Sequence, residues 1–123
     1  MKINIKRLNH IQICIPKGSE KTARQFYTGL LQLEEIEKPY SLKGRGGFWL
    51  KVAGIEIHIG TEEITGKSKR HPAFEVENVD VVKSFLKKNG VETKDEIPIP
   101  GVSRFSLFDP FGNRIEFLER VDS

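Results

Sequence analysis

The feature that most restricts the fold of this 123-residue chain is an internal repeat. Positions in the second half match positions of similar character in the first half at separations of 58 to 61 residues. The matched pairs are His10 with His71, Ser19 with Asn78, Phe26 with Phe85, Gly54 with Gly112, and His58 with Glu116. A nearly constant separation is typical of a duplicated supersecondary unit. We therefore expect two copies of one unit, at about residues 8–60 and 71–120, joined by a linker at about 61–70.

Each copy is predicted to contain a strand, a helix and three further strands. Alternating apolar and polar residues predict the strands, and an apolar stripe with helical spacing predicts each helix. The first copy has expected strands at 8–15, 33–37, 48–52 and 55–59, and a helix capped by Ser19 that buries Ala23, Phe26, Tyr27, Leu30 and Leu31. The second has strands at 71–77, 91–97, 104–108 and 114–118, and a helix capped by Asn78 that faces inward with Val82, Phe85 and Leu86. The fold class is therefore α+β.

Composition narrows the protein class. Lys and Arg number 20 against 17 Asp and Glu, and a net charge of +3 with interspersed signs does not favour nucleic acid. The single Cys14 excludes an internal disulfide and a zinc site of several thiolates. No apolar run approaches the roughly 18 residues that a membrane span needs. We expect one cytoplasmic domain over residues 1–123 that binds neither nucleic acid nor membrane.

The histidines carry the main functional signal. The chain has three, all in predicted strands, and the fourth equivalent position of the repeat holds a carboxylate: His10, His58, His71 and Glu116. If an approximate two-fold axis relates the copies, these four side chains converge on it. Imidazole nitrogens and a carboxylate oxygen suit a divalent ion such as Zn, Ni, Mn, Co or Fe. We predict a metal site, against the alternative that each histidine is a half-buried strand residue satisfied by a neighbour.

A longer motif resembles a known family. The stretch from Asp109 to Glu116 reads Asp-Pro-Phe-Gly-Asn-Arg-Ile-Glu, and with the two units it resembles the vicinal oxygen chelate superfamily over Leu8 to Glu119. That superfamily includes glyoxalase I, bleomycin-resistance proteins, fosfomycin-resistance thiol transferases and extradiol dioxygenases. The resemblance implies that the two sheets curve into a partly open mixed-sheet barrel with outer helices. It also implies that the first strand of each unit lies at a sheet edge. Pro72 agrees with this, because a proline in the fifth strand predicts that the strand lies at an edge or begins there.

The same resemblance implies roles for particular residues. The metal positions match His10, His58, His71 and Glu116, although glyoxalase I usually has a carboxylate where this chain has His58. Glu116 then remains as the proton-transfer base, and His58 is a ligand, a residue that orients a ligand, or an acid/base group. Further candidates for substrate binding are Gln12, Arg45, Arg104 and Trp49.

The resulting functional prediction is a glyoxalase-like lyase, isomerase or transferase, or a dioxygenase. Its divalent metal would stabilise an enolate or alkoxide of a small oxygenated metabolite, which the positive net charge allows to be anionic. The alternative is a metal-free binding protein like the bleomycin-resistance proteins, and a third hypothesis is a sensor or assembly subunit with a vestigial site. We expect a homodimer.

Overall fold

The structure is a computed structural model that describes residues 1–63, 66 and 68–121. The chain divides into two compact units, Met1–Thr65 (unit 1) and Gly66–Ser123 (unit 2). The division falls inside the predicted linker. Among the described residues, no helix is both long enough and apolar enough to cross a membrane.

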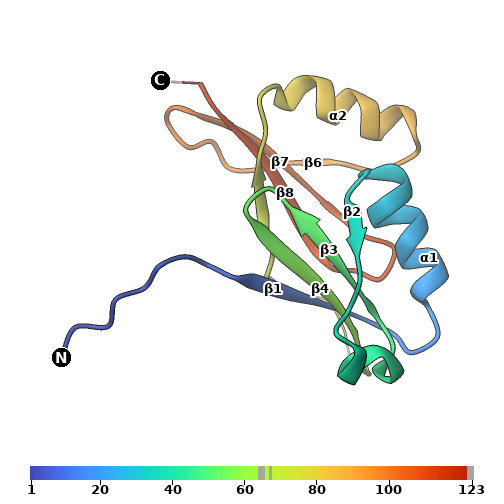
Figure 1. Ribbon diagram of the computed structural model, residues 1–123. Coiled ribbons are helices and arrows are strands. Elements are labelled where there is room, and N and C mark those ends of the chain that lie inside the picture. Colours follow the sequence, from blue (N-terminus) through green and yellow to red (C-terminus); the bar gives the residue numbers. More distant parts are fainter. Residues whose placement is uncertain (64–65, 67, 122–123) are drawn as a thin grey trace. The chain divides into compact units, whose positions relative to one another are not determined.

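Unit 1 contains a four-stranded mixed sheet with the order β1-β4-β3-β2. Its strands are β1 (His10–Ile15), β2 (Glu34–Ile36), β3 (Phe48–Val52) and β4 (Ile55–Thr61) (Figure 1). β1 runs parallel to β4, and the other neighbours are antiparallel. Helical segments follow β1 and β2: α1 (Glu20–Arg24), η1 (Gln25–Leu30) and η2 (Tyr40–Arg45).

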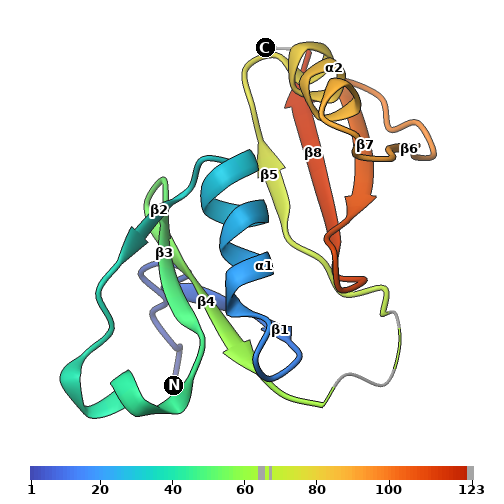
Figure 2. The same cartoon turned by 90° about the vertical axis from the view of Figure 1, so that its right-hand side faces the viewer.

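The two faces of this sheet differ because successive strand residues point to opposite sides. The register places the isoleucines of β1 and β4 on one face with Phe48 and Leu50. Except for the partly exposed Ile11 and Ile55, these residues are buried. α1 lies on that face (Figure 2), where the Arg24 guanidinium sits 4.5 Å from the centre of the Phe48 ring. η1 adds Phe26 and Tyr27 to the core. The polar residues of the strands are left on the opposite face.

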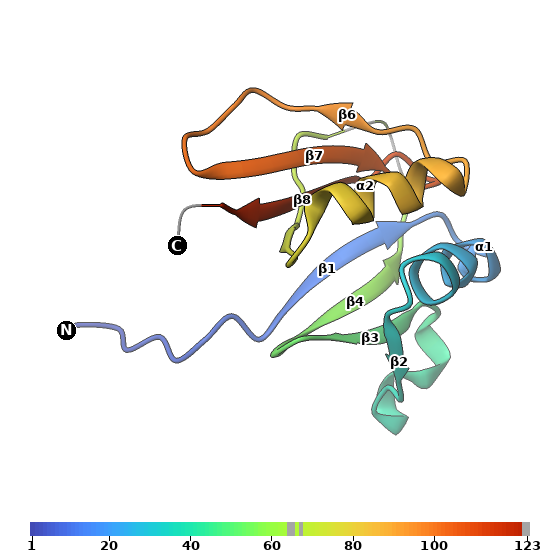
Figure 3. The same ribbon diagram turned by 90° about the horizontal axis from the view of Figure 1, so that it is seen from above.

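Unit 2 repeats this arrangement with the order β5-β8-β7-β6. Its elements are β5 (Ala73–Glu75), α2 (Val79–Lys88), β6 (Lys94–Asp95), β7 (Val102–Phe108) and β8 (Arg114–Arg120). α2 packs on β7 and β8 (Figure 3). At the start of α2, the Glu119 carboxylate accepts a hydrogen bond from the Val79 backbone N–H at 3.0 Å. Ile115 and Phe117 lie on the same side of β8 as Glu119 and are buried.

The predicted α+β class with two duplicated units is confirmed, and β1 and β5 are edge strands as expected. Each sheet taken by itself is open, with two edge strands. Several boundaries differ. The strand predicted at 8–15 begins at His10, the one at 71–77 is reduced to Ala73–Glu75, and the one at 91–97 to Lys94–Asp95.

Both predicted helices also need correction. Asn78 accepts from the Val81 N–H as a cap should, but the Ser19 hydroxyl instead donates to the Pro16 carbonyl at 2.5 Å. The first helix continues from α1 into a π-helix, η1, which the apolar stripe did not predict. In α2, Phe85 is 40 % exposed, because one residue of helix turns it about 100° from the buried Leu86.

A buried carboxylate organises the turn between β7 and β8. Asp109 accepts hydrogen bonds from the backbone N–H groups of Phe111 and Asn113 and from the Asn113 amide, each at 2.8 Å. Gly112 has a positive φ of 89°, which glycine adopts without strain. The turn thereby sets the register that pairs Ser106 with Glu116.

We expect Asp109→Ala to lower the free energy of unfolding by about 2–3 kcal/mol, because it leaves turn donors without their charged acceptor. Urea denaturation at pH 7 measures this change. Glu92→Ala removes an exposed carboxylate and serves as the control, with an expected change below about 0.5 kcal/mol. Equal effects of the two substitutions would contradict the role of Asp109.

Gly47 marks the closest backbone approach in unit 1. Its φ is 74°, and a Cβ at this position would lie 2.0 Å from the Ile59 carbonyl oxygen. Its N–H donates to the Glu20 carboxylate at 3.1 Å. The loop after η2 therefore fits against β4 only with glycine at this position.

Gly47→Ala should lower the free energy of unfolding by about 2–4 kcal/mol, since it adds backbone strain and a clash with Ile59. Gly44→Ala lies three residues earlier, in η2, where φ is not positive and a Cβ would meet nothing within 4 Å. This control should change stability by less than about 0.5 kcal/mol. Thermal and urea unfolding of both variants measure the difference in stability between them. Equal stabilities would show that the loop at Gly47 does not pack against β4.

Candidate functional site

Three aromatic rings stack on the polar face of unit 1. β4 runs between β1 and β3, and the His58 ring lies parallel to Trp49, with centroids 3.7 Å apart and planes 3° apart. His10 stacks on His58 at 4.0 Å and 15°. His58 is only 9 % exposed. Trp49, His58 and His10 form what we call the ring stack.

Each histidine has one ring nitrogen hydrogen-bonded to an oxygen, which requires that this nitrogen carry the proton. A neutral ring then keeps a lone pair on its other nitrogen. The three bonds run from His10 Nδ1 to Asn9 Oδ1 (2.8 Å), from His58 Nε2 to Glu56 Oε1 (2.9 Å) and from His71 Nδ1 to the Lys69 carbonyl oxygen (2.8 Å).

Unit 2 brings His71 and Glu116 together on the polar side of its sheet. His71 Nε2 lies 3.4 Å from Glu116 Oε1, and Glu116 is 5 % exposed. Arg104 donates to the same carboxylate oxygen at 3.0 Å. Its Nε and Nη2 donate to the Ile97 carbonyl at 3.2 and 2.8 Å. Arg104 thus connects Glu116 to the segment before β7.

A second carboxylate lies near this group. Glu96 accepts a hydrogen bond from the Ser106 hydroxyl at 2.7 Å and pairs with the Arg114 guanidinium. These contacts hold the pKa of Glu96 below its ordinary value, the Ser106 bond contributing most, although burial acts in the opposite direction. Glu96 is therefore ionised and balanced by Arg114 at neutral pH.

The remaining predicted residues are Gln12 and Arg45, and Gln12 pairs with His58 across β1 and β4. Gln12 donates weakly to the Cys14 thiol at 3.7 Å and lies across Gly60, where a Cβ would approach its amide nitrogen to 2.5 Å. Burial raises the pKa of the Cys14 thiol, in keeping with a structural role. Arg45 is exposed at the end of η2.

The predicted four-ligand metal site stays a prediction. Within either unit, no three described His, Cys, Asp or Glu side chains are grouped to hold an ion. Unit 1 supplies His10 and His58, and unit 2 supplies His71 and Glu116.

Sequence reasoning missed Glu56, the partner of His58. The signal was present, because residues two apart on a strand share a face, and β4 carries Glu56 and His58 in that spacing. It also missed Lys69, whose carbonyl orients His71 from a connection with no strand pattern. That contact had no sequence signal.

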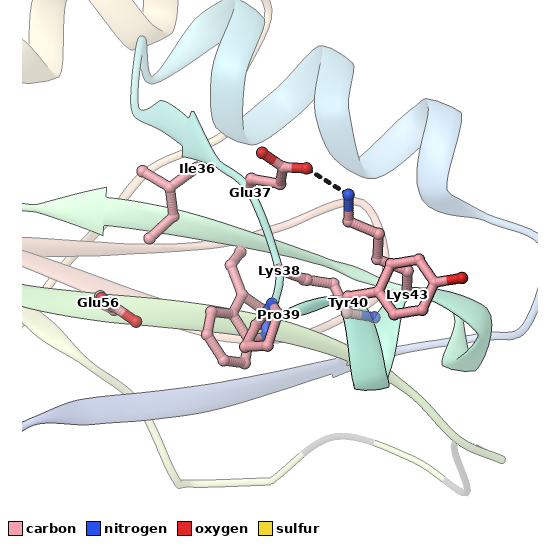
Figure 4. A pocket seen from close by; sticks show the side chains of 8 residues that line it. Ile36, Glu37, Lys38, Pro39, Tyr40, Lys43 and Glu56 are labelled. Carbon is pink, nitrogen blue, oxygen red and sulfur yellow. Dashed lines mark hydrogen bonds and ion pairs between the residues drawn. The ribbon is translucent and has the colours of Figure 1, made fainter.

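A pocket of about 370 Å³ opens beside the ring stack in unit 1 (Figure 4). The segment from β2 into η2 forms one side of it, and β3 and β4 form the other. The lining residues are Ile36, Glu37, Lys38, Pro39, Tyr40 and Lys43 from the first side, and Trp49 and Glu56 from the second. None of the first six was predicted as a site residue.

Comparisons with known proteins agree on one family. The family model for the Glyoxalase/Bleomycin resistance protein/Dioxygenase superfamily matches residues 7–117. A solved structure of a Bacillus anthracis protein, described as of the glyoxalase family, shares 45 % identity over 98 % of this chain and 99 % of its own, with a TM-score of 0.92. No curated protein matches the sequence.

More distant structures are similar in fold alone. The fosfomycin resistance protein FosX of Listeria monocytogenes is 23 % identical, covers 94 % of each chain and has a TM-score of 0.74. An integron cassette protein from the mobile metagenome of V. cholerae is 17 % identical over 97 % of this chain and 98 % of its own, also at 0.74.

Arg104→Met should lower the free energy of unfolding by about 2–4 kcal/mol, because it leaves the buried Glu116 carboxylate without its cation. The double variant Arg104→Met/Glu116→Gln should recover most of that loss, since no buried charge remains. A double-mutant cycle in urea measures the coupling between the two residues.

The control for this cycle is Arg120→Met. Arg120 pairs with Glu75 at 3.5 Å, and both side chains are mostly exposed, so the expected cost is below about 0.5 kcal/mol. Additive effects of the Arg104 and Glu116 substitutions would show that the pair contributes no coupling.

Proposed function

Because the chain belongs to the Glyoxalase/Bleomycin resistance protein/Dioxygenase superfamily, we propose that it is a divalent-metal-dependent enzyme acting on a small oxygenated metabolite. The reaction class is that of a lyase, isomerase, transferase or dioxygenase. A cytoplasmic homodimer is part of the same proposal. His10, His71 and Glu116 are the proposed ligands, with His58 as a further ligand or as an acid/base group.

The orientation of the imidazoles is the observation that carries this proposal. Histidines that bind metals usually donate their second ring N–H to a carboxylate or a backbone carbonyl. His58 and His71 make such a bond, and His10 donates to the side-chain amide oxygen of Asn9. Each neutral ring then keeps one lone pair. At His71 that lone pair belongs to Nε2, which lies 3.4 Å from the Glu116 carboxylate. A lone pair and a carboxylate at this distance repel each other unless a proton or a cation lies between them.

The ring stack favours the acid/base role for His58 over the ligand role. Stacked rings hold their in-plane lone pairs in two separate, nearly parallel planes, so His10 and His58 do not point at a common ion. Glu56 holds the His58 ring through Nε2 and leaves Nδ1 to accept a proton from a substrate. His58 and Glu116 are the groups proposed to transfer the proton.

A bound divalent ion would supply Lewis-acid stabilisation of substrate oxygens. Arg104 now donates to the Glu116 oxygen that would serve as a ligand. If Arg104 is released from that oxygen, its guanidinium can bind a carboxylate or phosphate of the substrate. This is the role that we propose for Arg104. Gln12, Arg45 and Trp49 are proposed as the other substrate contacts.

The alternative function is metal-free binding and sequestration of a small molecule. The salt bridge from Arg104 to Glu116 favours it, because a cation is already paired with the carboxylate. The parallel stacking of His10 and His58 favours it as well. Metal content therefore separates the two functions.

Elemental analysis of the purified, untagged protein tests the proposal. We expect about one Zn, Ni, Mn, Co or Fe per chain, and loss of that metal in His71→Ala and in Glu116→Gln. Glu75→Gln, which changes an exposed carboxylate of β5, should retain it. His58→Gln should also retain it if His58 is an acid/base group.

Absence of metal, with no thermal stabilisation when these five ions are added, would overturn the enzyme proposal in favour of sequestration. Equal metal content in the Glu116→Gln and Glu75→Gln proteins would show that the ion binds elsewhere.

A further inference from the structure

We infer that the pocket between the β2–η2 segment and strands β3 and β4 binds a flat, uncharged ring portion of a small molecule. The inference extends the proposed function. It rests on that function in one respect only, which is that the bound ring is taken to be part of the substrate. The binding itself requires residues of unit 1 alone and no metal.

The lining offers ring and aliphatic surface. Trp49, Tyr40, Ile36 and Pro39 contribute two aromatic rings, a branched aliphatic side chain and a pyrrolidine ring. Ile36 pairs with Trp49 across β2 and β3, so their side chains share the polar face of the sheet. A conjugated ring of the ligand can gain both apolar burial and stacking against such a surface.

The charges of the lining are balanced and already engaged. Glu37 and Lys43 form an ion pair, drawn as a dashed line in Figure 4. The hydrogen bond from Lys43 lowers the pKa of Glu37, which keeps the pair ionised at neutral pH.

The other two charged groups are engaged as well. Lys38 donates to the Gly46 carbonyl at 2.7 Å, and Glu56 accepts from His58 at 2.9 Å. The lining thus holds two ammonium groups and two carboxylates. Because these charges cancel, an ionised ligand group gains no net attraction from the lining, whereas an uncharged ring needs none.

The pocket also adjoins the groups proposed for chemistry. Trp49 lines the pocket and stacks on His58, and Glu56 lines the pocket and binds His58. A substrate with its ring in the pocket would therefore present its adjoining atoms to the ring stack. The expected substrate class is a metabolite with an aromatic or conjugated ring attached to its oxygenated portion.

Two fluorescent probes that differ by one sulfonate test the inference: N-phenyl-1-naphthylamine, which is neutral, and 8-anilino-1-naphthalenesulfonate, which is anionic. Trp49 is the only tryptophan of the chain, so its quenching reports binding at this place. We expect the neutral probe to quench Trp49 emission and to bind at least ten-fold more tightly than the sulfonate. The neutral probe should bind with the same affinity in the presence of EDTA and to the Glu116→Gln protein. This result would show that probe binding does not depend on a bound metal, whether or not the metal proposal is correct.

Variants locate the bound probe. Ile36→Asp puts a carboxylate into the pocket and should weaken the neutral probe at least ten-fold. Tyr40→Ala removes a ring that is 90 % exposed, so it should leave folding intact and weaken the probe several-fold. Ile97→Asp makes the matched change at an exposed isoleucine of unit 2 and should have no effect.

Three results would overturn the inference. The first is no quenching of Trp49 by the neutral probe. The second is tighter binding of the sulfonate that Lys43→Gln abolishes, since the pocket would then select an anion. The third is equal weakening by Ile97→Asp and by the two pocket variants.

Discussion

The strand residues of the candidate site depend on one constraint, the alternation of side chains between the two faces of a sheet that a helix covers on one side only. In unit 1 the covered face contains Ile57, and in unit 2 it contains Phe117. Apolar residues occupy one set of alternate positions, and the other set is left to polar and aromatic side chains. His58, Arg104 and Glu116 all belong to that second set.

The two copies share this framework but carry different chemistry on the polar face. Unit 1 has the ring stack and a pocket lined by equal numbers of lysines and glutamates. Unit 2 has ion pairs, with Arg104 on Glu116 and Arg114 on Glu96. A duplicated unit conserves the positions from which side chains project, because backbone pairing sets them, while the side chains at those positions are free to differ. Superfamily membership therefore defines where chemistry occurs more closely than which chemistry it is.

Much of the fold was predictable because it follows from short-range patterns. Alternation located the long strands β4, β7 and β8, and the repeat predicted the same order of elements in both units. The errors arose where a local pattern competes with packing. The Ser19 hydroxyl donates to the Pro16 carbonyl instead of capping the helix. Phe85 is exposed, although the equivalent Phe26 of the first unit is buried. A short strand such as β6 is defined by its pairing with a neighbouring strand, so its first and last residues cannot be predicted from its own sequence.

The sequence by itself determined the duplicated α+β units and the candidate histidines with Glu116, because periodicity and a repeat are properties of the chain alone. The edge positions of β1 and β5 followed from the resemblance to the superfamily. Only the tertiary structure decided what each side chain contacts. It paired His58 with Glu56, oriented His71 through the Lys69 carbonyl, and placed Arg104 on Glu116. It also built the pocket beside Trp49, since a cavity depends on how the segment after β2 packs on two strands that follow it in the chain.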